Sequence, residues 1–267
     1  MPVGLMEVAT FAAGGLVGAI LGLVGGGGSV LAVPLLVYGV GVSSPHLAIG
    51  TSALAVSVSA LTNLAAHARA GNVKWACASV FTVAGVLGAA LGSSVAKLVD
   101  GHRLLALFGA MMIVIGLLML RTPRRADRSD VRFTRETAAH LAPRLIGLGA
   151  GVGILSGFFG IGGGFLVVPA LLVATSMPMI SAVGSSLVSV AAFGATTGVN
   201  YALSGLVDLR IAGLFIAGGV LGGFAGVALG RRLAQHKNAL RVIFAVGVIA
   251  VGLYVVARGA APYLQGH

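Results

Sequence analysis

Long apolar stretches separated by short polar or glycine-rich breaks run along the whole chain. Eight of them approach or reach the roughly 20 residues that a helix needs to cross about 30 Å of hydrocarbon. They are residues 5–24, 47–66, 75–96, 104–120, 145–159, 182–203, 209–229 and 242–257. Two shorter stretches, residues 29–40 and 165–174, each follow a glycine cluster and are too short to cross comfortably. The pattern predicts an all-α polytopic membrane protein with 8 to 10 membrane segments.

The first stretch, residues 5–24, contains Glu7 and has no Lys or Arg before it. A secretory signal peptide carries a positive segment ahead of a shorter apolar core. We therefore expect a retained membrane segment here.

The two glycine clusters are copies of one another. Residues 25–34, GGGGSVLAVP, reappear 135 positions later as GIGGGFLVVP at residues 160–169. The triplet that starts at Gly50 matches the one at Gly184, and residues 85–88 match 219–222, both at a spacing of 134. Self-similarity at half the chain length indicates a duplication. We divide the chain into a first transmembrane repeat (1–120), a cytoplasmic basic linker (121–144) and a second transmembrane repeat (145–267).

Charge indicates how the two repeats are oriented. Seven of the 17 Lys and Arg residues lie between Arg121 and Arg144, and such a basic loop marks the cytoplasmic side. Counting crossings outward from this linker places both termini outside. Arg69 and Lys74 then fall inside, whereas the matching loop of the second repeat, around Asp208, falls outside without net charge. Because the bias alternates, the repeats are predicted to be inverted, an architecture of many secondary transporters.

Composition agrees with a membrane protein. The chain is 58% hydrophobic with a mean hydropathy of +1.06, and only 9% of its residues are charged; soluble domains carry about a quarter. The net charge of +11 follows from the linker and the ends of apolar stretches, so we expect a bilayer and no nucleic acid as partner. Cys77 is the only cysteine, which excludes an intrachain disulfide and a cysteine metal site. No nucleotide-binding motif is present, and we expect no metal or cofactor.

The glycine clusters are the first candidate chemistry. Backbone that leaves the helix at membrane depth survives only where it is buried in protein or lines a cavity. Each following helix has free N–H groups and its positive dipole end at the break. Two such ends facing one another at mid-membrane suit an anion. The alternative is close helix packing, which we prefer for the regularly spaced glycines 14, 18 and 22, and 218, 222, 226 and 230.

Polar residues in the span after each break form a second candidate layer. Hydroxyls and amides can donate to an anion without bringing charge into the membrane; the alternative is that they bond to their own helix backbone. The full set of candidate substrate-binding residues is Gly26, Gly27, Gly28, Ser29, Thr51, Ser52, Asn63, Gly162, Gly163, Gly164, Ser185, Ser186, Thr197 and Asn200. For His46 and His67, at span ends, we favour solvated or interfacial roles, and we expect Trp75 and Tyr201 at membrane interfaces.

None of the six acidic residues lies at the middle of a predicted span. Coupling to protons or sodium through a buried carboxylate therefore has no obvious carrier. An anion leaving a cell needs none, since about 2.3 kcal/mol per charge per 100 mV drives it out. Export is plausible on this ground, and import stays open.

Several of these segments together resemble the sulfite exporter TauE/SafE family of membrane permeases. They are the glycine clusters running into Val-Pro at Pro34 and Pro169, the triplets at Gly50 and Gly184, and residues 68–75, ARAGNVKW. The resemblance covers about residues 8–256. It implies a plasma-membrane permease for sulfite or another small sulfur-containing or organic anion, with no catalytic residues. Lys74 stands where the family usually carries an acid, whereas Asp208 keeps it in the second repeat.

We therefore expect a secondary transporter that moves a small anion outward, possible as a homo-oligomer, and not an enzyme. An anion channel of the same architecture, an importer of a related anion and a non-transporting scaffold are the alternatives.

Overall fold

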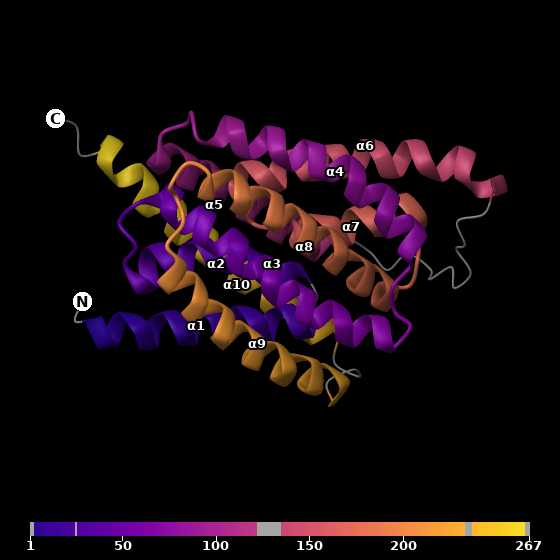
Figure 1. The fold of residues 1–267 in the computed structure, drawn as a ribbon, viewed down its shortest axis with the longest axis horizontal. Coiled ribbons are helices and arrows are strands. Elements are labelled where there is room, and N and C mark those ends of the chain that lie inside the picture. The colour runs from indigo at the N-terminus through magenta and orange to yellow at the C-terminus, as the bar shows by residue number, and fades with distance from the viewer. Residues whose placement is uncertain (1–2, 25, 122–134, 233–236, 265–267) are drawn as a thin grey trace.

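The computed structural model describes residues 3–24, 26–121, 135–232 and 237–264 (Figure 1). Eight long helices dominate the described part: α1 (Val3–Val24), α3 (Pro45–Arg69), α4 (Trp75–Ala96), α5 (Gly101–Arg121), α6 (Arg135–Phe159), α8 (Met179–Ala202), α9 (Leu209–Arg232) and α10 (Lys237–Leu264). Each contains a segment long and apolar enough to cross a membrane. The eight predicted spans and the all-α class are confirmed, and the protein is a multi-pass membrane protein.

The two short elements differ from each other. α7 (Gly164–Thr175) is a regular α-helix that contains Pro169. Its counterpart is a 3-10 turn (Gly26–Leu31), one α-helical turn α2 (Ala32–Pro34) and a π turn (Leu35–Val40). The expected short apolar helix is present in both copies, as Gly27–Val40 and Gly164–Thr175, but only the second is a regular α-helix throughout. Added to Gly28, a Cβ would lie only 2.6 Å from Leu21 N of α1, so the chain winds tightly against α1 instead of turning away.

The helices run between two ends of the bundle (Figure 1). At the terminal end α1 begins and α10 ends; at the linker end α5 ends and α6 begins. α1 and α6 occupy equivalent positions in the two repeats and start at opposite ends. The two repeats therefore cross the bundle in opposite directions, which is the inverted arrangement that the charges predict.

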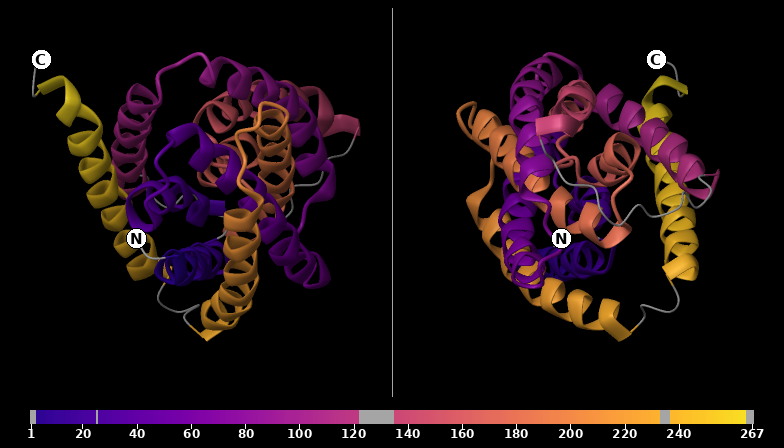
Figure 2. Two further views of the ribbon diagram at one scale, coloured as in Figure 1. Left: turned by 60° about the vertical axis from the view of Figure 1, so that its left-hand side comes forward. Right: turned by 90° about the vertical axis from the view of Figure 1, so that its right-hand side faces the viewer.

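Contacts between helices repeat with the same symmetry. α1 packs along α9, and its counterpart α6 packs along α4, the counterpart of α9. α3 packs on α8 at the centre, and α5 packs on α10, so each of these two pairs joins equivalent helices (Figures 1 and 2). Each repeat thus contributes helices to the packing of the other, and the halves interlock.

Small residues make these seams possible. Gly18 of α1 meets the backbone of Gly219 in α9, and the equivalent Gly153 of α6 meets the backbone of Gly85 in α4. The glycines predicted as packing faces at positions 14, 18, 22, 218, 222 and 226 all touch the opposite helix backbone. Helix backbones this close make van der Waals contacts with each other in place of contacts with lipid. These contacts hold the helix pairs together.

The basic linker falls mostly on residues 122–134, which lie outside the described residues, and its last part from Arg135 belongs to α6. Trp75 is 54% exposed, as an interfacial residue should be. Tyr201 is completely buried, so its predicted interfacial position is wrong. Gly50 of α3 packs against the Tyr201 side chain.

Candidate functional site at the two helix breaks

The two helix breaks meet at the centre of the bundle. The 3-10 turn contacts α7, and Val30, Ile161 and Phe165 belong to one buried cluster. A Cβ on Gly162 would lie 3.3 Å from both Val56 of α3 and Val190 of α8. Because Val56 and Val190 are 134 residues apart, they are equivalent residues of the two repeats. Gly162 therefore lies close to the axis that relates the repeats.

A hydrogen bond between the repeats marks the same axis. Ser57 Oγ of α3 donates to the carbonyl of Ala191 in α8 at 2.6 Å, and these residues are also 134 positions apart. Both groups are buried. The bond links α3 to α8 beside the breaks and fixes the position of one helix along the other.

Glycine conformation shapes the second break. Gly160, Gly162 and Gly163 have φ of 68°, 65° and 73°, a region that side chains with a Cβ rarely adopt. The carbonyl of Gly163 accepts the first bonds of α7, from Leu166 N and Val167 N, both at 2.9 Å. The N–H groups of Gly164 and Phe165 therefore precede the intrahelical hydrogen bonds of α7 and form part of the positive dipole end of the helix.

Ser156, one turn before this break, is a candidate binding residue that the sequence analysis did not identify. Its side chain is fully buried, and its Oγ has no hydrogen-bond partner in the described part of the protein. A Cβ on Gly163 would lie 2.7 Å from this Oγ. A buried hydroxyl without a partner costs about 1–3 kcal/mol. Its counterpart in the first repeat is Leu21, so a search for polar residues matched between repeats could not find it.

The first break is packed more tightly. Gly27, Gly28 and Ser29 are buried, and Gly26 begins the 3-10 turn. Gly162, Gly163 and Gly164 of the second break are buried too. The structure therefore brings the six predicted glycines and Ser29 into the two breaks that meet at the centre.

The matched hydroxyls of Thr51 and Ser185 bind backbone of the opposite repeat. Thr51 Oγ1 accepts the N–H of Asp208 at 3.0 Å, and Ser185 Oγ accepts the N–H of Lys74 at 2.9 Å. These bonds are equivalent under the repeat. They hold the loops that precede α9 and α4. Because the donor is the backbone N–H, the bond forms whether the loop residue is acidic, as Asp208 is, or basic, as Lys74 is.

Ser52 and Ser186 are equivalent in the same way. Ser52 Oγ donates to the carbonyl of Ile49 at 3.1 Å, and Ser186 Oγ donates to that of Val183 at 2.8 Å. Both hydroxyls satisfy their own helix, as the alternative interpretation proposed. Their role in substrate binding stays a prediction.

The remaining candidates lie apart from one another. Thr197 Oγ1 is fully buried and has no partner within the described residues. Asn200 lies near the terminal end, where its side chain bonds to Ser93 and Lys97. Asn63 lies towards the linker end and donates through Nδ2 to the carbonyl of Ser59 at 3.0 Å.

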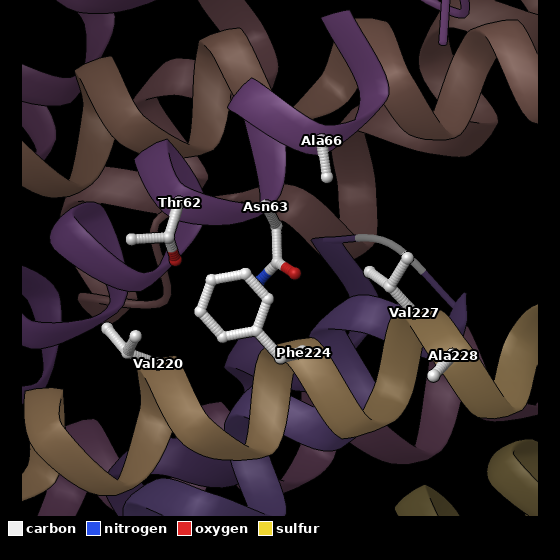
Figure 3. A pocket seen from close by; sticks show the side chains of 7 residues that line it. All are labelled: Thr62, Asn63, Ala66, Val220, Phe224, Val227 and Ala228. Carbon is white, nitrogen blue, oxygen red and sulfur yellow. The ribbon is translucent and has the colours of Figure 1, made fainter. Parts of the chain in front are cut away.

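Asn63 borders a cavity of about 230 Å³ between α3 and α9 (Figure 3). The amide and Thr62 supply its polar groups, and the rest is apolar: Ala66, Val220, Phe224, Val227 and Ala228. A second hollow of about 600 Å³ lies between α6 and α7 and includes Arg144. Both hollows lie in the half of the bundle nearer the linker end.

Titratable residues do not assemble into a metal site: the described part of the chain holds no group of three or more His, Cys, Asp or Glu that could bind a metal ion. What the breaks offer is amide N–H groups, a helix dipole and a buried hydroxyl. These groups bind anions by donation alone.

Two interlocked, inverted halves, each interrupted by a break at the centre, define a polytopic protein of the transporter class. The chain belongs to the sulfite exporter TauE/SafE family, whose model matches residues 10–255. It is 52% identical over 251 residues, 94% of this chain and 95% of the relative, to a "Probable membrane transporter protein" of Xylella fastidiosa strain Temecula1.

A more distant relative has the same description. The "Probable membrane transporter protein YunE" of Bacillus subtilis strain 168 is 30% identical over 262 residues, 92% of this chain and 94% of the relative. No solved structure matches the chain. The protein is therefore a membrane transporter of this family.

Proposed function

We propose that this protein is a secondary transporter of the plasma membrane that moves sulfite or a small organosulfonate outward without changing it chemically. The observation that carries the proposal is the second break. There the N–H groups of Gly164 and Phe165, in the first turn of α7, and the unpaired hydroxyl of Ser156 lie at the centre of the bundle, next to the axis that relates the repeats.

The chemistry of the break fits a small oxyanion. A sulfite or sulfonate group carries three oxygens that accept several hydrogen bonds at once, and bonds to a charged partner are worth about 1.5–3 kcal/mol each. The helix dipole adds an attraction for negative charge without a buried cation that would hold the substrate too firmly.

The packing of the centre favours a transporter over a channel. The glycines of the two breaks at positions 27, 28, 160 and 162–164 are buried, and the two hollows described above lie on the linker side of them. If the linker end is cytoplasmic, as the charge bias predicts, substrate approaches from the cytoplasm. The membrane potential then favours release outside.

Ser156→Ala tests this proposal. The change removes a hydroxyl that has no protein partner, so the folded state should be as stable as the original or more stable. Loss of one hydrogen bond to a charged substrate should weaken binding about 10–100-fold. The measurement is the concentration dependence of ³⁵S-sulfite flux into proteoliposomes, with thermal unfolding in detergent measured on the same preparation.

Thr10→Val is the matched control. Thr10 is buried, but its hydroxyl donates to the carbonyl of Met6 in its own helix at 2.7 Å, far from the breaks. This variant should keep the flux. If Ser156→Ala transports sulfite with unchanged concentration dependence, the assignment of the second break as the substrate site is wrong.

A further inference from the structure

We propose that the terminal end carries a second binding site for a small oxyanion, built around Lys97, which receives the anion between the central break and water. The site consists of Ser93, Ser94, Lys97, Asn200 and Ser204 and is called the Lys97 cluster below. The proposal rests on the proposed function only for the identity of the anion.

Lys97 is held in place by neutral oxygens. Its Nζ donates to the carbonyl of Asn200 at 3.2 Å, to Asn200 Oδ1 at 2.8 Å and to Ser204 Oγ at 2.9 Å. The side chain is half-buried. Among the described residues all of its hydrogen-bond acceptors are uncharged, so no carboxylate pairs with the ammonium group at the edge of the bundle.

Hydroxyl and amide groups surround this charge. Asn200 Nδ2 donates to Ser93 Oγ at 2.6 Å and to Ser94 Oγ at 3.0 Å, and Ser94 and Ser204 are both exposed. Serine hydroxyls rotate and can donate or accept. Ser94 Oγ now donates to the carbonyl of Ala90 at 2.8 Å and Ser204 Oγ to the carbonyl of Asn200 at 3.4 Å, and an anion beside the ammonium group would take over these two donors.

The equivalent place between α3 and α9, at the linker end, shows that the fold does not require these polar groups. Ala66 takes the position of Asn200, and Val227 and Ala228 take the positions of Ser93 and Ser94. The result there is the apolar cavity of about 230 Å³ described above (Figure 3). Lys97 itself is matched by another basic residue, Arg231. Since the α3–α9 seam packs this region with alanine and valine, the asparagine and serines of the α8–α4 seam call for a separate reason.

Two unpartnered polar atoms lie close to the Lys97 cluster. The Tyr201 ring centroid lies 6.0 Å from Lys97 Nζ and 6.2 Å from the His46 ring centroid. Tyr201 Oη and His46 Nδ1 are buried and have no hydrogen-bond partner in the described protein. Gly50, which packs on Tyr201, adjoins Ile49, and the Ile49 side chain touches Gly160 of the second break. The cluster and the central break are thus joined by a short chain of contacts.

The test uses a cysteine reporter in the cluster. In a Cys77→Ala, Ser204→Cys protein in proteoliposomes, the labelling rates of an anionic and a cationic methanethiosulfonate reagent are compared. A nearby unneutralised ammonium should favour the anionic reagent, and Lys97→Gln should lower the anionic-to-cationic rate ratio about tenfold. Lys97→Arg should retain it. Arg258→Gln removes an exposed charge outside the cluster, near the end of α10, and should leave the ratio unchanged.

Protection measures binding directly. Millimolar methanesulfonate or sulfate should slow labelling when Lys97 is present, and at least tenfold more should be needed in Lys97→Gln. A rate ratio unaffected by Lys97→Gln, or the absence of protection at both Ser204→Cys and a second reporter, Ser94→Cys, overturns the proposal. Protection without sulfite flux would leave this site standing and refute the proposed transport, whereas flux without protection would do the reverse.

Discussion

Gly153 in α6 offers a sensitive test of the packing between the two repeats. A Cβ at this position would lie 2.6 Å from Gly85 Cα in α4 and closer still to the Gly85 carbonyl oxygen. Carbon atoms pack at about 3.5–4.0 Å, so Gly153→Ala requires α4 and α6 to move apart by about 1 Å. Overpacking of this kind costs about 1–3 kcal/mol.

Gly151 on the same helix is the matched control, because nothing lies within 4 Å of a Cβ added there. Gly151→Ala should be neutral or should stabilise by up to about 1 kcal/mol through helix propensity. Thermal unfolding of the purified proteins in detergent measures both. With about 2–4 °C per kcal/mol, we expect Gly153→Ala to melt several degrees below Gly151→Ala. Equal melting temperatures would refute the packing of α4 on α6.

Three further predictions follow from the repeat. Gly18→Ala should destabilise the fold about as much as Gly153→Ala, since Gly18 meets Gly219 in the equivalent seam. A much smaller drop in melting temperature would contradict the equivalence of the two seams. Thr51→Val and Ser185→Ala each remove the acceptor of a loop N–H and should each cost about 1–2 kcal/mol; no change in melting temperature in either would contradict the bracing role. In a Cys77→Ala background, Lys74→Cys and Asp208→Cys, which are equivalent positions 134 residues apart, should react with impermeant reagents from opposite sides of the membrane; labelling from the same side would refute the inverted topology.

The sequence predicts the spans, the duplication and the meeting of the breaks, because apolar length and glycine clusters are local signals. It does not reveal what the matched hydroxyls bind: Thr51 and Ser185 were found by their spacing, but their partners belong to loops more than a hundred residues away. Such partners depend on how the two repeats interlock.

Asymmetry between the repeats hid the other groups. Ser156 is matched by a leucine, and Lys97 looked like one more charge at a span end. The burial of Tyr201 and the polar groups around Lys97 arise where α3, α4 and α8 come together at the terminal end. A comparison of equivalent positions finds only the residues that the two repeats share. Residues that differ between the repeats, such as Ser156, are missed, although a transporter also depends on differences between its two ends.

Counterflow of ³⁵S-sulfite in proteoliposomes of the purified protein tests the central claim most directly. Vesicles loaded with unlabelled sulfite should transiently accumulate the label from outside, and the accumulation should be weaker in Ser156→Ala at low substrate. Label uptake indistinguishable from that of protein-free vesicles, for sulfite and for small sulfonates alike, would contradict the account.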